Sequence, residues 1–547
     1  MLAEKGDSMN QNIFPKRIIL TEGNVDNAQA LIEEKSLQIG LKEPNLCVLK
    51  GKSSVILDFG KELAGGVRIL TLAVSGNNQV RLRFGESISE TSAEIGEKNA
   101  GNDHSNRDFK VELQYFSDMA FGQTGFRFLR IDTLDDNSII KLKAVVAKTE
   151  IDERLEIGSF VCDDELVNNI WETAAYTLRL CLQNGYFWDG VKRDRLVWIG
   201  DLYPEMRAAH CLYGIAPETV KCLEYSLYEL ENYEWLASLP SYCLWWIIVL
   251  RDEYQASGDK KILVKFLPYV KMILDRVKKC VNDDGSTSYP RNFIDWQTNY
   301  TEGDLLDKKT DSATGMEYLT QIALQKAKEI LSILEIDFSI CDNLLTILAK
   351  RNERKVSKYK QISALGVLSG DKSENNKDIL LNGGAKGMST FMSYPILTAL
   401  AEFGEEKKAL SMLKDYYGGM LSVGATTFWE DFDIEWLKNS GRIDAITPCD
   451  KKDIHGDFGA FCYKGFRHSL CHGWSAGVIP YLIETIVGVK IVDAGMRKIK
   501  ILPKLSGLKK VDAIIPSPYG EIKVSHEVVA VGKTITNIEK PKEIEII

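Results

Sequence analysis

The chain has 547 residues and a formal net charge of −9 at pH 7, and 45% of its residues are hydrophobic. This length predicts more than one domain, since single hydrophobic cores stop growing at about 250–300 residues. The acidic balance argues against nucleic acid as a partner, because no basic surplus exists to neutralise phosphates. Residues 1–24 lack the apolar core of a signal peptide, and the longest apolar run, Leu239–Leu250, is too short to span a bilayer. We therefore expect a cytoplasmic protein without a membrane partner.

The first third of the chain has the alternation of β-strands. Val67–Val74, Val80–Phe84, Phe126–Ile131 and Ile139–Val146 alternate or run apolar between turns rich in Gly, Asn and Asp. This pattern predicts an antiparallel β-sandwich, which we place in an N-terminal domain of residues 1–155.

From residue 160 the apolar residues recur at intervals of three and four, as on amphipathic helices. The first predicted helix is Glu165–Gln183, with Asp163 and Asp164 as capping candidates. The later predicted helices are Pro217–Asn232, Ser241–Ala256, Lys260–Val281, Ser312–Glu335, Ser389–Phe403, Lys407–Gly418 and Ser475–Ile486. About a dozen helices suit a double ring of helical hairpins, the (α/α)6 barrel, although an α-solenoid has a similar count. We place this barrel in residues 156–487.

The strand pattern returns near Val489 and continues through Lys498–Leu502 and Val511–Ile515. It predicts a small C-terminal β-sandwich in residues 488–547. The expected fold is thus a multidomain α+β protein with a central helical barrel. We interpret Asp371–Asn376 as a polar loop.

The segment from Asp189 to Asp201 (DGVKRDRLVWIGD) is the most informative part of the sequence. It combines acids, cations and aromatic residues, namely Asp189, Asp194, Asp201, Lys192, Arg193, Arg195, Trp188 and Trp198. Glycosidases need carboxyl groups with tuned acidity, and aromatic faces stack on sugar rings. Composition alone is equally consistent with a structural loop of ion pairs.

The charges around Asp194 pose a chemical problem. A general acid must carry a proton near neutral pH, whereas Arg193 and Arg195 favour its ionised form. Burial against Trp198 or a second nearby carboxylate would oppose these cations. Asp201 precedes Pro204 and an apolar helical pattern, so it is also a candidate helix N-cap.

Three later segments pair acidic or histidine side chains with tryptophan. They are Trp429–Glu430, followed by Asp431, then Asp295–Trp296, and His472 with Trp474. Alternation along an extended segment would send Glu430 and Asp431 to opposite sides, so only one of them should face a pocket. Each Trp alone is more often a core residue, and His472 alone is more often structural.

No cofactor is expected. The 11 cysteines form no CxxC motif, and the six histidines never fall at metal-ligand spacing. A nucleophilic pair of Cys471 and His472 is disfavoured, because adjacent side chains rarely point the same way and no third orienting group is evident. The sequence also lacks a phosphate-binding loop and a dinucleotide fingerprint.

Together these segments resemble the bacterial α-L-rhamnosidases of glycoside hydrolase family 78. Asp189–Asp201 resembles the family signature, Ala425–Glu430 resembles the segment of its general base, and Ser469–Gly477 resembles its pocket histidine segment. Leu57–Gly66 and Gly125–Ile131 also look like its β-sandwich. Many longer relatives have Cys-Pro after the first Asp and Glu as the acid; here Gly190-Val191 and Asp194 stand instead, as in a compact branch.

The resemblance implies an inverting glycosidase that releases terminal α-L-rhamnose from rhamnosylated glycosides or short oligosaccharides. Asp194 would be the general acid and Glu430 the general base. The implied sugar-binding residues are Asp189, Arg193, Trp198, Asp201, Asp295, Trp296, Trp429 and His472. The expected partner is a small carbohydrate, and compact relatives suggest a homodimer.

Two other functions fit the same residues. One is another (α/α)6 glycosidase or an unsaturated-uronide hydrolase, which an Arg or Lys at the position facing the sugar C6 would favour. The other is a catalytically inert sugar-binding protein, because carboxylates also bind hydroxyl groups.

Overall fold

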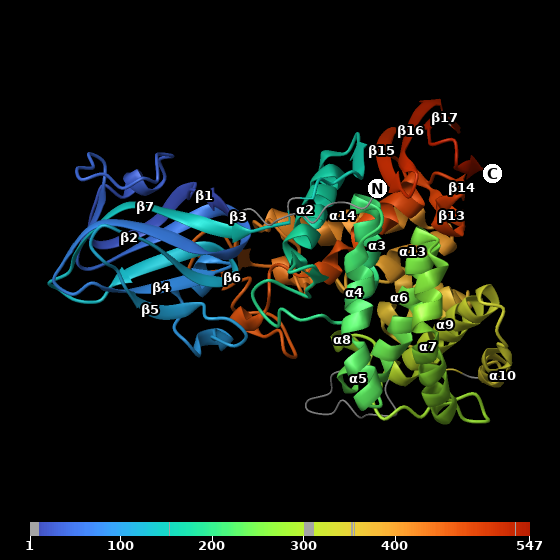
Figure 1. Cartoon of the computed structure of the whole chain (residues 1–547). Coiled ribbons are helices and arrows are strands. Elements are labelled where there is room, and N and C mark those ends of the chain that lie inside the picture. Colours follow the sequence, from blue (N-terminus) through green and yellow to red (C-terminus); the bar gives the residue numbers. More distant parts are fainter. Residues whose placement is uncertain (1–9, 153, 300–310, 352–353, 355, 531) are drawn as a thin grey trace.

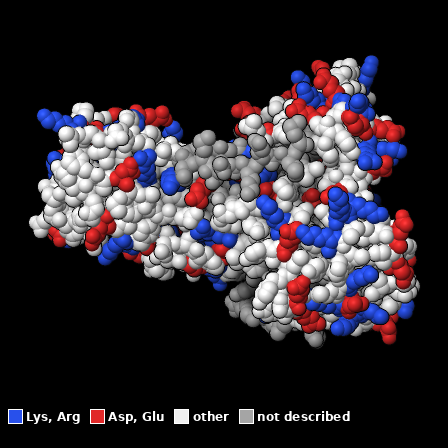
Figure 2. Space-filling model, in the orientation of Figure 1, with Lys and Arg blue, Asp and Glu red and all other residues white. Residues whose placement is uncertain are grey.

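The computed structural model describes residues 10–152, 154–299, 311–351, 354, 356–530 and 532–547. An N-terminal β-domain and a C-terminal β-domain flank a central helical body (Figure 1). Within these ranges, no helix is both long and apolar enough to cross a membrane. On the face drawn in Figure 2, basic and acidic residues are interspersed rather than gathered into one basic surface.

The N-terminal domain is a seven-stranded antiparallel sheet. Its strands are β1 (Asn10–Ile13), β2 (Arg17–Asp26), β3 (Cys47–Ser75), β4 (Gln79–Gly85), β5 (Asp108–Glu112), β6 (Ser117–Thr133) and β7 (Ile139–Glu150). Lys141 of β7 pairs with both Val48 and Ala73 of the long strand β3, so β7 lies between the two ends of β3. The sheet therefore curls on itself and encloses an apolar core. The antiparallel strands expected in this region are present.

Six helices of the central body form a closed ring. They are α3 (Leu202–Tyr213), α6 (Pro240–Ser257), α9 (Asp311–Ile333), α11 (Lys360–Ser369), α13 (Ser393–Glu402) and α15 (Val478–Tyr481). Each contacts the next in this order, and α15 contacts α3. The helices packed around them are α2 (Glu165–Cys181), α4 (Pro217–Tyr225), α7 (Lys260–Cys280), α10 (Ser339–Leu348), α12 (Glu374–Leu381) and α14 (Glu406–Ser422), and α5 (Leu227–Asn232) contacts α4.

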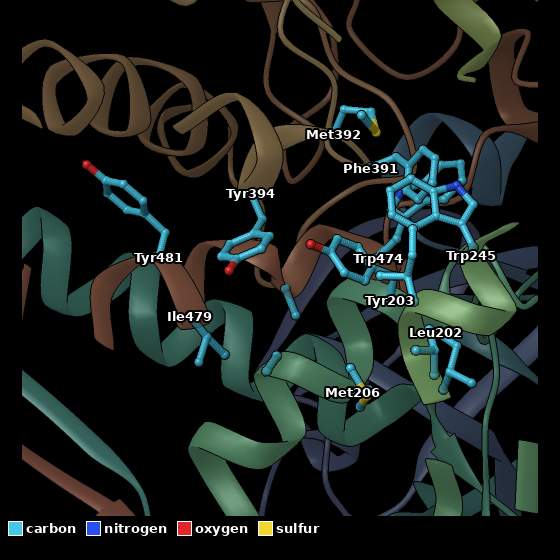
Figure 3. Close-up of a cluster of buried hydrophobic side chains, with 14 of the residues drawn as sticks. Leu202, Tyr203, Met206, Trp245, Phe391, Met392, Tyr394, Trp474, Ile479 and Tyr481 are labelled. Carbon is cyan, nitrogen blue, oxygen red and sulfur yellow. The ribbon is translucent and has the colours of Figure 1, made fainter. Parts of the chain in front are cut away.

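Sequence patterns separate the inner helices from the outer ones. In α6 the whole stretch 240–250 is buried, as expected for a helix that is covered on all sides. In α7 only one face is buried, and it includes Phe266, Val270, Ile273 and Val277 at spacings of three and four. Side chains of α3, α6, α13 and α15 meet in one buried cluster inside the ring (Figure 3).

Several helices differ from the prediction. Helices α10, α11 and α12 had not been predicted, and α12 begins inside the expected polar loop, because its sequence ENNKDILL is apolar only at its end. The predicted helix Ser475–Ile486 is instead a 3-10 turn, a short α-helix and a π-helical turn. A Cβ atom on Gly473 would lie 2.0 Å from Glu205 Oε1, so this turn packs closely against α3, and a larger residue would require the Glu205 side chain to move.

The C-terminal domain consists of two small sheets. Strands β13 (Val489–Asp493), β14 (Lys498–Ile501) and β18 (Glu545–Ile546) form one sheet. The other contains β15 (Lys510–Ser517), β16 (Gly520–Ala530), β17 (Lys533–Glu539) and β8 (Ser159–Cys162). Strand β8 precedes the helices in the chain, inside the segment that we had placed in the barrel. Four residues at a sheet edge carry too little pattern to reveal such a long-range pairing.

Candidate active site

A pocket of about 220 Å³ opens where the Asp189–Asp201 segment meets the loops that follow α14. Eight of the ten residues predicted for the site line it: Asp189, Arg193, Asp194, Trp198, Asp201, Trp296, Glu430 and His472. Further lining residues are Ala237, Leu239, Tyr242, Arg291, Phe293, Cys462, Tyr463 and Trp474. The structure thus brings segments more than two hundred residues apart in the sequence to one cavity.

The Asp189–Asp201 segment is irregular and is held by hydrogen bonds within itself and to the His472 segment. The Asp189 N–H donates to Leu196 O at 3.0 Å, and the Leu196 N–H donates to Asp189 Oδ1 at 2.9 Å. Asp194 and Arg195 have φ angles of 54° and 59°, in the left-handed region. Such non-glycine conformations cost about 1–3 kcal/mol each and cluster at functional sites. This turn directs Asp194 toward the pocket.

Arg193 joins the two predicted catalytic carboxylates. Its Nη1 donates to Asp194 Oδ1 at 2.9 Å, and its Nη2 forms a buried ion pair with Glu430 Oε1. Burial of Arg193 opposes its charge, but Glu430 and Asp194 outweigh this and raise the pKa of Arg193. One planar guanidinium therefore holds both carboxylates.

Arg195 points away from Asp194. Its Nη1 donates to Gln123 O of the β-domain at 3.3 Å, and its guanidinium lies 5.0 Å from the Trp188 ring centroid. The charge conflict seen in the sequence is thus half resolved, because of these two arginines only Arg193 contacts Asp194.

Glu430 is buried and held by several contacts. The Ser469 N–H donates to Glu430 Oε2 at 3.1 Å, while Trp474 Nε1 and Thr390 Oγ1 donate to the Glu430 carbonyl at 2.9 and 2.6 Å. Burial raises the pKa of Glu430, although Arg193 and the Ser469 N–H oppose this shift. The buried Glu430 carboxylate therefore holds a proton more readily than an ordinary glutamate does.

Asp431 faces the other way, as alternation had suggested. Its Oδ1 accepts hydrogen bonds from Gln297 Nε2 at 3.0 Å and from the Phe432 N–H at 2.9 Å, and it is not a pocket-lining residue. Burial, followed by Asp295, raises the pKa of Asp431 to about 7.

His472 lies among three acids. Its Nε2 is 3.7 Å from Glu430 Oε1, 3.8 Å from Asp201 Oδ2 and 3.9 Å from Asp189 Oδ2. Burial, together with Arg193 and His468, lowers the pKa of His472 well below its ordinary value. The shift favours the neutral imidazole, in which Nε2, the ring nitrogen that faces these acids, either donates or accepts a hydrogen bond.

Asp201 occupies the N-cap position of α3, but its side chain makes no capping hydrogen bond. The carboxyl group is thus left for the pocket. Burial, followed by Glu205 and Glu430, raises the pKa of Asp201 well above its ordinary value, and burial with Asp201 does the same for Asp189. Protonated carboxyl groups can donate as well as accept hydrogen bonds.

Asp295 and Trp429 are not pocket-lining residues. Asp295 is buried and accepts a hydrogen bond from Ser389 Oγ at 2.5 Å, and burial raises its pKa to about 6. The Trp429 ring is fully buried, with its centroid 5.6 Å from that of Phe432 and 6.1 Å from that of His468. Their predicted contacts with sugar remain predictions.

Aromatic rings form much of the pocket wall. Trp198 packs edge-on against Tyr242 at 5.9 Å, and Trp296 packs against Phe293 at 5.2 Å and against Tyr463 at 5.9 Å. Tyr242 could be seen in the sequence only as part of an apolar helix, and Tyr463 lies in a loop without any motif. The wall offers ring faces to a small polar ligand with apolar faces, such as a sugar.

Behind the pocket, Lys192 connects the segment to the β-domain. Its ammonium lies 2.8 Å from Glu86 Oε2 and 3.1 Å from Glu90 Oε1, and donates to His468 O at 2.6 Å. Glu86, Glu90 and His455 also bring ligand atoms within 4.8 Å of one another, but the Lys192 ammonium already supplies a positive charge to both carboxylates. We therefore interpret this cluster as a structural ion-pair network.

Residues 155–335 match the family model described as the bacterial alpha-L-rhamnosidase six-hairpin glycosidase domain. The resemblance to the α-L-rhamnosidases is confirmed. No curated protein sequence matches the chain. Several solved structures share its fold.

One is the GH78 rhamnosidase of Bacillus sp. GL1, with a TM-score of 0.74 and 21% identity over 92% of this chain and 54% of that one. Another is the α-L-rhamnosidase of Dictyoglumus thermophilum, with a TM-score of 0.68 and 16% identity over 90% of this chain and 56% of that one. A rhamnosidase from Klebsiella oxytoca with rhamnose bound has a TM-score of 0.66 and 18% identity over 87% of this chain and 96% of that one. The chain spans about half the length of the first two.

Proposed function

We propose that the protein is an inverting α-L-rhamnosidase, with Asp194 as general acid and Glu430 as general base. The observation that carries this proposal is the pair of carboxylates that face one pocket and are bound by the same Arg193 guanidinium. The family model over residues 155–335 and the rhamnosidase neighbours support the substrate class. We also propose that the ring of six helices is the inner ring of an (α/α)6 barrel.

The two carboxylates differ in the way that acid and base roles require. The Asp194 side chain is 18% exposed at the edge of the pocket, where a leaving group departs, whereas that of Glu430 is only 3% exposed. Asp194 would donate its proton to the glycosidic oxygen as the bond to the aglycone breaks. Glu430 would take a proton from a water molecule that attacks the anomeric carbon from the opposite face.

The remaining polar side chains would bind the sugar hydroxyl groups. Asp189 and Asp201 would accept hydrogen bonds from the sugar or, when protonated, donate them, and His472 Nε2 would bind a hydroxyl group beside them. Trp198 and Trp296 would cover the apolar faces of the ring. Asp295 and Trp429 would not touch the sugar. They would position Trp296 and Glu430, which follow them directly in the sequence.

A panel of aryl glycosides tests the proposal. We expect the wild-type protein to prefer the α-L-rhamnoside, and Asp194→Asn and Glu430→Gln to lose hydrolysis of an alkyl or disaccharide rhamnoside. Anomeric NMR of the first-formed product should give the configuration opposite to that of the substrate. A retained configuration contradicts inversion, and faster cleavage of another aryl sugar contradicts the specificity.

Arg291 favours one alternative function. Its side chain lines the pocket, and a cation there would suit the carboxylate of an unsaturated uronide. Assays of an unsaturated uronide beside the α-L-rhamnoside separate the two functions. Cleavage of the uronide alone, lost in Arg291→Gln, would replace the rhamnosidase proposal.

A further inference from the structure

A loop of the N-terminal β-domain reaches the edge of the pocket. His104 Nε2 lies 3.2 Å from Asp194 Oδ1, and the next residue, Ser105, donates from Oγ to Lys192 O at 2.9 Å. On the other side, Arg467 Nε donates to Asp103 Oδ2 at 2.8 Å. The loop is thus fixed on both sides of His104, and the imidazole is held against the proposed acid.

The proposed reaction creates a need for proton transfer at this position. Each inverting turnover leaves Asp194 without its proton and leaves an extra proton on Glu430. Glu430 returns its proton to solvent, and Asp194 must gain one before the next turnover. Arg193, the other side chain bound to Asp194 Oδ1, cannot supply it, because a guanidinium does not lose its proton in proteins.

We propose that His104 is the group that reprotonates Asp194 from solvent, so that the β-domain supplies part of the catalytic apparatus. This inference rests on the proposed function. The imidazolium gives its Nε2 proton to the Asp194 carboxylate, and the neutral imidazole then takes a proton from water at the surface. One proton enters at His104 for each proton that leaves Glu430, so the cycle balances without any other reactant.

Position and exposure support this route. The His104 side chain is 33% exposed and that of Asp194 is 18% exposed, so the pair leads from solvent to the pocket. The charged groups around the imidazole are Asp194, Asp103 at 3.8 Å, and the arginines Arg193 and Arg467 that pair with these two acids. Imidazole is the side chain best suited to exchange protons near neutral pH.

Two rhamnosides that differ in leaving group test the inference. An alkyl α-L-rhamnoside needs a protonated leaving oxygen, whereas a nitrophenyl α-L-rhamnoside does not. For His104→Ala we expect kcat on the alkyl substrate to fall about 10–100-fold and kcat on the nitrophenyl substrate to change less than about twofold. Added imidazole should restore the alkyl reaction. Pyrazole, which has a similar shape but is a much weaker base, should not.

Matched variants separate proton transfer from support of the loop. His104→Gln can still donate a hydrogen bond to Asp194 but cannot transfer a proton to it. If proton transfer is what matters, this variant should be as slow as His104→Ala on the alkyl substrate. Ser105→Ala removes the anchor to Lys192 O but keeps His104, and it should leave the ratio of the two rates unchanged. Thermal unfolding checks that each variant is folded.

The outcomes distinguish this inference from the proposed function. Full alkyl activity in His104→Gln, an equal loss on both substrates, or a loss that imidazole does not restore overturns the inference alone. Wild-type protein that cleaves neither rhamnoside overturns the proposed function, and the inference with it.

Discussion

The two sides of the pocket hold their carboxylates in different ways. Glu430 is buried and is held by hydrogen bonds from Ser469, Thr390 and Trp474. Asp194 lies on an irregular loop in a left-handed conformation, with Arg193 on one side and a β-domain histidine on the other. Burial thus positions the proposed base, whereas the proposed acid is positioned by a neighbour in its own loop and by one contact with the β-domain. Substitutions on each side of the pocket test this difference.

The largest loss of activity is expected when the buried carboxylate, Glu430, is replaced. Glu430→Gln removes the only proposed acceptor for the proton of water, so we expect kcat to fall about 10³–10⁴-fold with any leaving group. Steady-state assays on alkyl and nitrophenyl α-L-rhamnosides measure the loss. Glu435→Gln is the matched control, because Glu435 lies on the same segment, pairs with exposed Lys438 and is not a pocket-lining residue. Equal activity in the two variants would remove Glu430 from the mechanism.

The link between the domains should show in stability. Lys192→Met leaves buried Glu86 and Glu90 without their cation, and breaking a buried ion pair in this way costs about 3–5 kcal/mol. The free energy of unfolding in urea measures the loss. Lys372→Met, which breaks the exposed pair with Glu402, should cost less than about 1 kcal/mol. If Lys192→Met and Lys372→Met lower the free energy of unfolding equally, the buried network between the domains contributes no more stability than an exposed ion pair.

The effect of replacing Asp194, the more exposed carboxylate, should depend on the leaving group of the substrate. Asp194→Asn should lower kcat about 10²-fold on an alkyl rhamnoside, because the leaving oxygen then departs without a proton. On a nitrophenyl rhamnoside, whose leaving group is a stable anion, the change should be small. Parallel losses on both substrates would mean that Asp194 binds sugar rather than donating a proton.

The sequence predicted most of the pocket but not the way it is held. Asp164 caps α2 as expected, accepting from the Leu166 N–H at 3.1 Å, because N-caps are local signals. The segment of Asp189 and the distant Glu430 were recognisable from residue types beside tryptophan. His104 and the acidic partners of Lys192 were not predicted, because they lie about ninety to one hundred residues away in another domain and belong to no motif. The left-handed turn at Asp194 also has no glycine to mark it.

The smallest effect concerns the pH dependence of activity and tests how strongly the Arg193 charge acts on Glu430 while it also binds Asp194. A general base acts in its ionised form, so activity is present above the pKa of Glu430 and is lost as the pH falls through it. Burial raises this pKa, so the acid limb of kcat/KM for a nitrophenyl rhamnoside should lie above the range of an ordinary glutamate. Arg193 opposes the shift, and Arg193→Gln should therefore move the limb upward by about one pH unit or more.

Arg195→Gln is the matched control for this pH profile, because Arg195 contacts Gln123 and Trp188 instead of either carboxylate. We expect its acid limb to coincide with that of the wild type. If both variants move the limb equally, the effect comes from the overall charge of the loop rather than from the ion pair with Glu430. If Arg193→Gln alone moves it, the guanidinium that binds Asp194 also tunes the base, and the two sides of the pocket are coupled through one side chain.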